Sequence, residues 1–107
     1  MHWLAPVFGF VLRKLPNHSS RKRFAKYFGP KFEGGVSKTA YGFAMYAHWH
    51  DNANRKGFEG SYGLVADFIR RMPSNSMFVD IGANQGGTTL LAAQVLDGQG
   101  KVFAYEP

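Results

Sequence analysis

The chain has 107 residues, of which 45% are hydrophobic and 16% aromatic; this is enough for one small core and excludes disorder throughout. Cysteine is absent, which excludes a disulfide framework and thiolate metal sites. The net charge of +6 is uneven, because residues 1–31 hold seven basic and no acidic side chains, whereas residues 32–107 hold six basic and seven acidic ones. The basic excess therefore belongs to the N-terminal segment.

Two helices are predicted in this basic segment. Residues 3–15 carry apolar side chains at helical spacing, and Pro6 falls in the first turn, where its missing N–H does no harm. Ser19 or Ser20 can cap a second short helix that runs through Tyr27. The pair is interpreted as a helical extension that packs on its own domain.

The same segment leaves a second function open. Its cations can attract the phosphates of nucleic acid or of lipid headgroups, and Trp3, Phe8, Val11 and Phe24 can form an apolar face between them. The apolar stretch is far shorter than the ~20 residues of a membrane span, and its charges follow it, unlike those of a signal peptide. We expect a cytoplasmic protein with no transmembrane segment, weak membrane-surface contact at most, and no nucleic-acid partner. The alternative function is a non-catalytic module that binds a membrane surface or nucleic acid.

The next segment is predicted to contain strands. Residues 33–40 are typical of a loop or a short edge strand, and residues 41–49 alternate with the period of two that indicates a half-buried strand. Residues 51–54 have turn chemistry. His48 and His50 share a face of the strand, as zinc ligands can, but a third ligand with suitable spacing is missing. A polar, partly exposed strand end is therefore favoured over a metal site.

A loop over residues 57–60 is predicted to precede a helix over residues 62–71. Ser61 can cap this helix. The apolar residues spaced along it form a stripe that we expect to be buried: Leu64, Val65, Phe68, Ile69 and Met72.

The last part of the chain is predicted to be a βαβ unit. Residues 78–81 form a short apolar run, typical of a parallel strand buried on both faces, and Asp80 interrupts it at the end where ligands bind in open α/β sheets. A helix is expected over residues 88–96 and a second strand over residues 101–105. Glu106 follows at the tip of that strand, where a carboxylate can accept hydrogen bonds from both hydroxyls of a ribose.

The spacing of the glycines between the first strand and the helix separates two classes of cofactor. The dinucleotide fingerprint is Gly-x-Gly-x-x-Gly, whereas this turn reads Asp80-x-Gly82-x-Asn84-x-Gly86. The middle glycine is replaced by asparagine and the last one comes a position early, so no pyrophosphate-binding backbone is evident. The pattern disfavours a nicotinamide-dependent oxidoreductase.

Residues 78–86 and 102–107 resemble motif I and the following acidic strand end of class I S-adenosylmethionine-dependent methyltransferases. The motifs Asp-Ile-Gly-Ala-Asn-x-Gly and Phe-Ala-Tyr-Glu-Pro are most similar to those of the FkbM family. In that family a Gly-x-x-Glu element precedes motif I, and residues 57–60 resemble the segment that contains it. The resemblance implies a Rossmann-like α/β methyltransferase fold. It also implies S-adenosyl-L-methionine as cofactor and O-methylation of a sugar, a polyketide or another small-molecule acceptor.

The resemblance also implies which residues hold the cofactor. Asp80 and the loop of Gly82, Ala83, Asn84 and Gly86 would hold its methionine part, with Asp80 near the amino group, and Glu106 would bind the ribose hydroxyls. No catalytic base and no metal ligand is assigned in the chain.

The predicted domain boundary lies between a basic extension, residues 1–56, and the start of the cofactor-binding domain, residues 57–107. A methyltransferase sheet needs more strands than this βαβ unit supplies. We therefore expect the fold to be truncated after its second parallel strand, the chain to be part of a longer enzyme, and the chain alone to be inactive.

Overall fold

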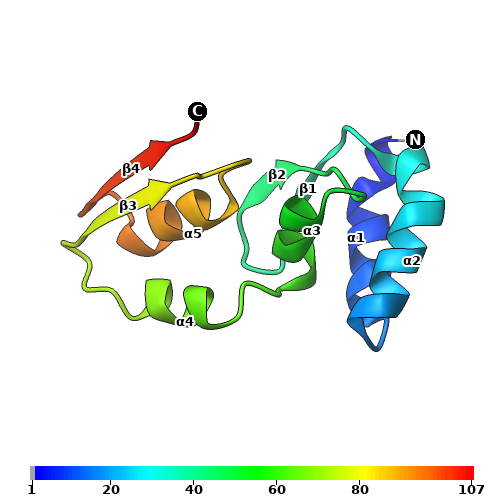
Figure 1. Ribbon diagram of the computed structural model, residues 1–107, viewed down its shortest axis with the longest axis horizontal. Coiled ribbons are helices and arrows are strands. Elements are labelled where there is room, and N and C mark those ends of the chain that lie inside the picture. Colours follow the sequence, from blue (N-terminus) through cyan, green and yellow to red (C-terminus); the bar gives the residue numbers. More distant parts are fainter. Residues whose placement is uncertain (1) are drawn as a thin grey trace. The chain divides into compact units, whose positions relative to one another are not determined.

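A computed structural model describes residues 2–107, except for the side chain of His2. The chain divides into two compact units, Met1–Ser61 and Tyr62–Pro107 (Figure 1). The division therefore falls five residues after the predicted one, and each unit is described by itself.

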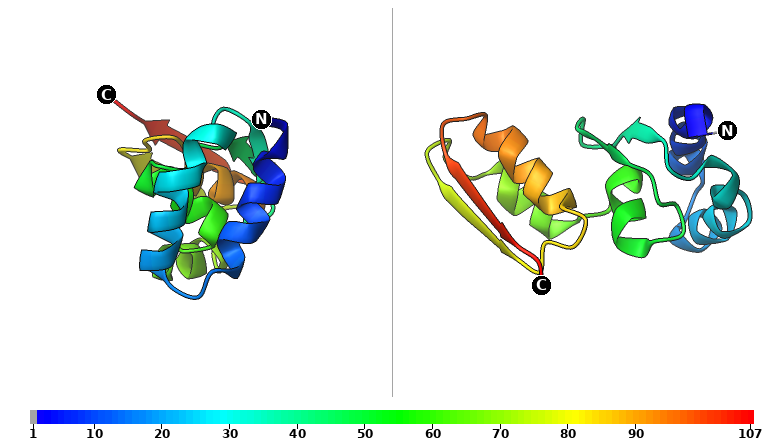
Figure 2. Two further views of the ribbon diagram at one scale, coloured as in Figure 1. Left: turned by 90° about the vertical axis from the view of Figure 1, so that its right-hand side faces the viewer. Right: turned by 90° about the horizontal axis from the view of Figure 1, so that it is seen from above.

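The first unit begins with two helices that lie side by side (Figure 2). Its helical elements before the first strand are η1 (His2–Leu4), α1 (Ala5–Lys14), α2 (His18–Phe28) and η2 (Gly29–Phe32). Pro6 lies in the first turn of α1, as predicted. The predicted cap of α2 was wrong: Asn17 has the extended backbone of a capping residue, and its side chain accepts a hydrogen bond of 2.8 Å from the Ser20 N–H.

An antiparallel hairpin follows, formed by β1 (Val36–Lys38) and β2 (Ala44–Tyr46), with Ser37 opposite Met45. Of the two alternatives given for residues 33–40, a loop or a short edge strand, the structure contains the strand. The strand predicted over residues 41–49 is shorter in the structure, yet its alternation extends further, because Met45, Ala47 and Trp49 are all buried. The predicted period of two is therefore confirmed even where strand pairing stops.

The helix α3 (Asn52–Glu59) occupies a stretch that was predicted to be a turn followed by a loop. Asp51 caps it by accepting a 2.8 Å hydrogen bond from the Asn54 N–H, and Gly60 ends it in the left-handed conformation, with φ of 75°. The turn prediction was wrong because Asp and Asn serve turns and helix caps by the same local hydrogen bond. The loop prediction was wrong because residues 57–59 form the last turn of α3, and only Gly60 lies beyond it.

The core of the first unit is aromatic. Trp49 is fully buried between Phe8 of α1 and Phe58 of α3, with ring centroids 4.6 and 4.7 Å away. Gly29 makes room for it, because a Cβ there would lie 2.7 Å from the Cβ of Trp49. The segment after β2, α1, α3 and η2 thus share one cluster of rings, because Phe32 of η2 also stacks on Phe8.

A buried ion pair lies in α3 beside this core. Arg55 and Glu59 have side chains that are 2% and 1% exposed, and the Arg55 Nε donates to Glu59 Oε1 over 2.8 Å. The guanidinium also donates to the carbonyl of Trp49 and to Asn52, while Ser61 donates to the second oxygen of Glu59. Both charges are therefore supplied with hydrogen-bond partners, as burial requires.

The second unit is a small α/β arrangement with a parallel two-stranded sheet. Its elements are α4 (Leu64–Arg70), β3 (Met77–Ile81), α5 (Gly87–Leu96) and β4 (Lys101–Tyr105). The strands pair from Met77 opposite Lys101 to Ile81 opposite Tyr105. The predicted strand–helix–strand order and the range of β4 are confirmed, and α5 starts one residue earlier than predicted.

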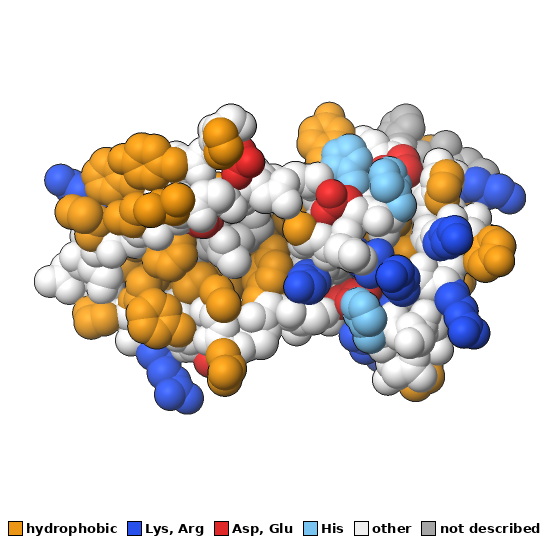
Figure 3. Space-filling model, viewed as in Figure 1, with side chains coloured by type: hydrophobic (Ala, Val, Ile, Leu, Met, Phe, Trp, Pro, Cys, Tyr) orange, Lys and Arg blue, Asp and Glu red, His pale blue; other side chains and the backbone are white. Residues whose placement is uncertain are grey.

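Both helices of the second unit lie on the same side of its sheet (Figure 2). Ile69, Leu91 and Leu96 are buried between them and the strands, whereas Ile81 and Val79 on the sheet are 83% and 49% exposed. Hydrophobic side chains therefore gather on the surface over β3, β4 and α4 (Figure 3). The predicted burial of the first strand on both faces was wrong, because only one face has a covering layer.

The helix α4 also departs from its prediction. Leu64, Val65 and Phe68 of the expected buried stripe are exposed, while Ile69 is buried. Ser61 does not cap it, because α4 begins at Leu64 and the Ser61 hydroxyl contacts Glu59. Among the described residues, no helix is both long enough and apolar enough to cross a membrane.

Candidate functional site

The carboxyl ends of β3 and β4 lie next to each other because the two strands are parallel and end in register, Ile81 opposite Tyr105. This geometry brings together the end of β3, the loop of residues 82–86 and the residue after β4. The carbonyl of Tyr105 accepts hydrogen bonds from the N–H groups of Gly82 and Ala83, over 2.8 and 3.1 Å. The predicted site residues are thus assembled at one edge of the sheet.

The loop between β3 and α5 is built from left-handed residues. Gly82, Asn84 and Gly86 have φ angles of 76°, 52° and 84°, a region that glycine enters freely and asparagine tolerates. A Cβ built on Gly82 or on Gly86 would meet no atom within 4 Å. These two glycines are therefore required by the turn of the backbone, and the space beside them is open to a ligand.

Glu106, the residue after β4, contacts the backbone of the loop between β3 and α5. Its Oε2 atom accepts a hydrogen bond of 2.6 Å from the Asn84 N–H. A carboxylate has about four acceptor positions, so this contact leaves capacity for hydroxyl donors. The sequence predicted a carboxylate at this strand tip, and the structure adds that it is tied to the loop.

Asp80 faces the start of α5. Its Oδ2 atom accepts hydrogen bonds of 2.7 Å from the hydroxyls of both Thr88 and Thr89. Neither threonine was predicted from the sequence to belong to the site. The available signal was a pair of hydroxyl side chains in the first turn of the helix that follows an acidic strand end.

The charged side chains of the site are both acidic. Asp80 and Glu106 flank a loop, residues 82–86, that carries no basic side chain. Negative charge favours a cationic or hydroxyl-bearing ligand and disfavours a pyrophosphate, which is usually cradled by backbone N–H groups and cations. The residues present therefore fit a cationic group beside a hydroxyl-bearing one.

The two histidines considered as metal ligands have a different partner. The Nδ1 atoms of His48 and His50 lie 3.1 and 2.6 Å from the two carboxylate oxygens of Glu33. Among the residues whose side chains are described, 3–107, no group of three or more His, Cys, Asp or Glu is arranged to hold a metal ion. Their exposure of 43% and 66% agrees with the favoured interpretation of a polar, partly exposed pair, but both residues follow β2 and do not lie on the predicted strand.

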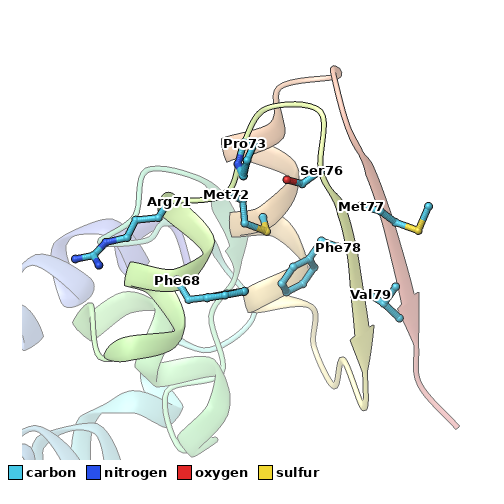
Figure 4. Close-up of a pocket in the computed structure, with 8 residues that line it drawn as sticks. All are labelled: Phe68, Arg71, Met72, Pro73, Ser76, Met77, Phe78 and Val79. Carbon is cyan, nitrogen blue, oxygen red and sulfur yellow. The ribbon is translucent and has the colours of Figure 1, made fainter.

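A hollow of about 450 Å³ lies between α4 and the beginning of β3. Phe68 and Met72 point into it from the helix side and Phe78 from the strand, whereas Met77 and Val79 point away (Figure 4). It lies at the amino end of β3, opposite the end that bears Asp80. This hollow is therefore separate from the candidate site.

Comparison of the chain with models of known protein families, with curated proteins and with solved structures finds no match.

Proposed function

We propose that the second unit carries the S-adenosylmethionine site of a Rossmann-like methyltransferase that acts on the hydroxyl of a small molecule. One observation carries the proposal: Asp80, the left-handed loop and Glu106 converge where two parallel strands end, and Glu106 contacts that loop directly. The resemblance of residues 78–86 and 102–107 to class I methyltransferases supports the choice of cofactor.

Each residue has a role that follows from its chemistry. Glu106 offers carboxylate oxygen to the two hydroxyls of a ribose. Gly82 and Gly86, with open space where side chains would be, let a ligand approach the backbone. Asp80, held by Thr88 and Thr89, adds negative charge for the amino group and the sulfonium.

When bound, the cofactor supplies a methyl group on a positively charged sulfur. The protein's own contribution is to bind and orient that group against an acceptor oxygen, which accounts for much of the rate enhancement in such transfers. A base must take the hydroxyl proton, and no residue of the chain is assigned to it.

Calorimetric titration with S-adenosylhomocysteine and, separately, with NAD tests the proposal. We expect binding of S-adenosylhomocysteine and none of NAD. Glu106→Gln should raise the Kd by about tenfold or more, since hydrogen bonds to a charged group are worth about 1.5–3 kcal/mol. Asp97→Asn removes an exposed acid of the same unit as the matched control, and it should leave the Kd unchanged.

Two outcomes would count against the proposal. Tighter binding of NAD would assign the site to a dinucleotide. An equal Kd for the Glu106→Gln, Asp97→Asn and unaltered proteins, all with the same circular dichroism, would remove Glu106 from the site.

A further inference from the structure

The helix α1 has two apolar faces, and the core uses only one of them. Ala5, Phe8 and Leu12 are buried. Val7, Phe10 and Val11 are 57%, 56% and 39% exposed and continue a line begun by Trp3 of η1, which is 71% exposed. Positions 3, 7, 10 and 11 have the spacing of one helical face, so these residues form a continuous stripe that we call the outer stripe.

An apolar groove adjoins the outer stripe. It lies between α1, α2 and η2, has a volume of about 300 Å³, and is lined only by hydrophobic side chains, including Val7, Phe24, Phe28 and Phe32. Beside it on α2, Tyr27 is 75% exposed. The uncovered apolar surface thus extends across both helices.

The segment of the chain that carries this surface is strongly basic. Residues 1–31 contain seven Lys and Arg and no Asp or Glu. Lys14 follows the outer stripe on α1, with its Nζ 5.3 Å from the centre of the Phe10 ring. Lys22, Arg23, Lys26 and Lys31 are exposed on α2 and η2. Several Lys and Arg side chains are visible on the face of the first unit that Figure 3 shows.

We propose that the outer stripe and its cations bind the surface of an anionic lipid bilayer, with α1 lying in the plane of the interface. Aliphatic and aromatic side chains would enter the boundary of headgroups and acyl chains, and the cations would contact the phosphates and carboxylates of the lipids. Trp3 and Tyr27 have the amphipathic rings that are enriched at that depth.

Two features favour a lipid surface over RNA. Valines 7 and 11 offer no ring on which a base could stack. The groove presents no polar side chain that could read a base edge, because all its lining residues are hydrophobic. The Lys and Arg side chains could bind the phosphates of either RNA or lipids, but the aliphatic side chains of the surface suit only the acyl chains of lipids.

The two tryptophans make the contact measurable. Trp3 is 71% exposed and Trp49 fully buried, so a change of emission on adding vesicles reports Trp3. With phosphatidylcholine vesicles that contain about 30% phosphatidylserine we expect a blue shift, and a much weaker one with pure phosphatidylcholine. The shift should disappear in Trp3→Phe although sedimentation with the vesicles persists.

Matched variants separate the apolar from the charged contribution. Val7→Ser/Phe10→Ser should lower vesicle affinity by about tenfold or more, while Val65→Ser/Phe68→Ser, a pair of similar exposure in the second unit, should not. Replacing Lys22, Arg23, Lys26 and Lys31 by Gln should have a comparable effect. The same change at Lys38, Lys56, Arg71 and Lys101, equal in charge, should have little effect.

The proposal is overturned if the Val7→Ser/Phe10→Ser protein, folded by circular dichroism, sediments with anionic vesicles as well as the unaltered protein does. It is also overturned if a single-stranded RNA binds and the vesicles do not. Binding of S-adenosylhomocysteine is measured without lipid, so either proposal can fail without the other.

Discussion

Glu106 and Asn84 are 22 residues apart in the chain, and the carboxylate of Glu106 accepts a 2.6 Å hydrogen bond from the backbone N–H of Asn84. This contact ties the loop after β3 to the residue after β4. It links the two parts of the site that the sequence pattern marked separately.

Removal of the carboxylate should loosen the loop before any ligand is added. In Glu106→Ala we expect the Asn84 amide proton to exchange with solvent about fivefold faster, because an exposed hydrogen bond contributes modestly. Hydrogen exchange followed by NMR measures this rate. The amide of Val79, inside β3, serves as the internal control; equal acceleration at both amides would mean that the sheet, not the loop, had been loosened.

The left-handed backbone of Asn84 makes a second prediction. Asn84→Val should lower the free energy of unfolding by about 1–2 kcal/mol, since a branched side chain is disfavoured at a φ of 52°. Asn84→Gly should be close to neutral, because glycine adopts this region freely. Urea unfolding measures both. If the two variants lose equal stability, the side chain of Asn84 and not its backbone conformation would be what matters.

The buried pair of Arg55 and Glu59 makes a third prediction. Glu59→Ala should cost about 3 kcal/mol, because the guanidinium stays buried without its counter-charge. Asp67→Ala, which removes an exposed acid, should cost less than about 0.5 kcal/mol. Thermal unfolding of the two variants compares them, and equal midpoints would show that the Arg55–Glu59 pair contributes nothing to stability.

The second unit could be predicted closely from the sequence because its signals are local. The range of β4 is bounded by a Gly-rich turn before Lys101, and the α5 helix starts beside Gly86, so short patterns suffice. Burial could not be predicted in the same way. Val79 and Phe68 have apolar side chains at suitable spacing, yet their exposure depends on whether another layer covers them, which no local pattern encodes.

The first unit shows where residue types are ambiguous. The run from Asp51 to Asn54 has the composition of a turn and forms a helix start, because one kind of side-chain hydrogen bond serves both.

In the second unit, the positions of Asp80 and Glu106 at adjacent strand ends were predicted. The contacts of Asp80 with Thr88 and Thr89 were not, because they depend on how the first turn of α5 is rotated toward β3.

The parallel pairing of β3 and β4 has a kinetic consequence. Parallel strands cannot form by a local hairpin, so Met77 meets Lys101 only after the intervening segment has crossed back along the sheet as α5. Asp80 and Glu106 are therefore brought together late and in one cooperative step. A substitution such as Leu91→Ala, at a buried position of α5 that is not itself a proposed ligand contact, would destabilise the packing of α5 and with it the assembly of the whole site.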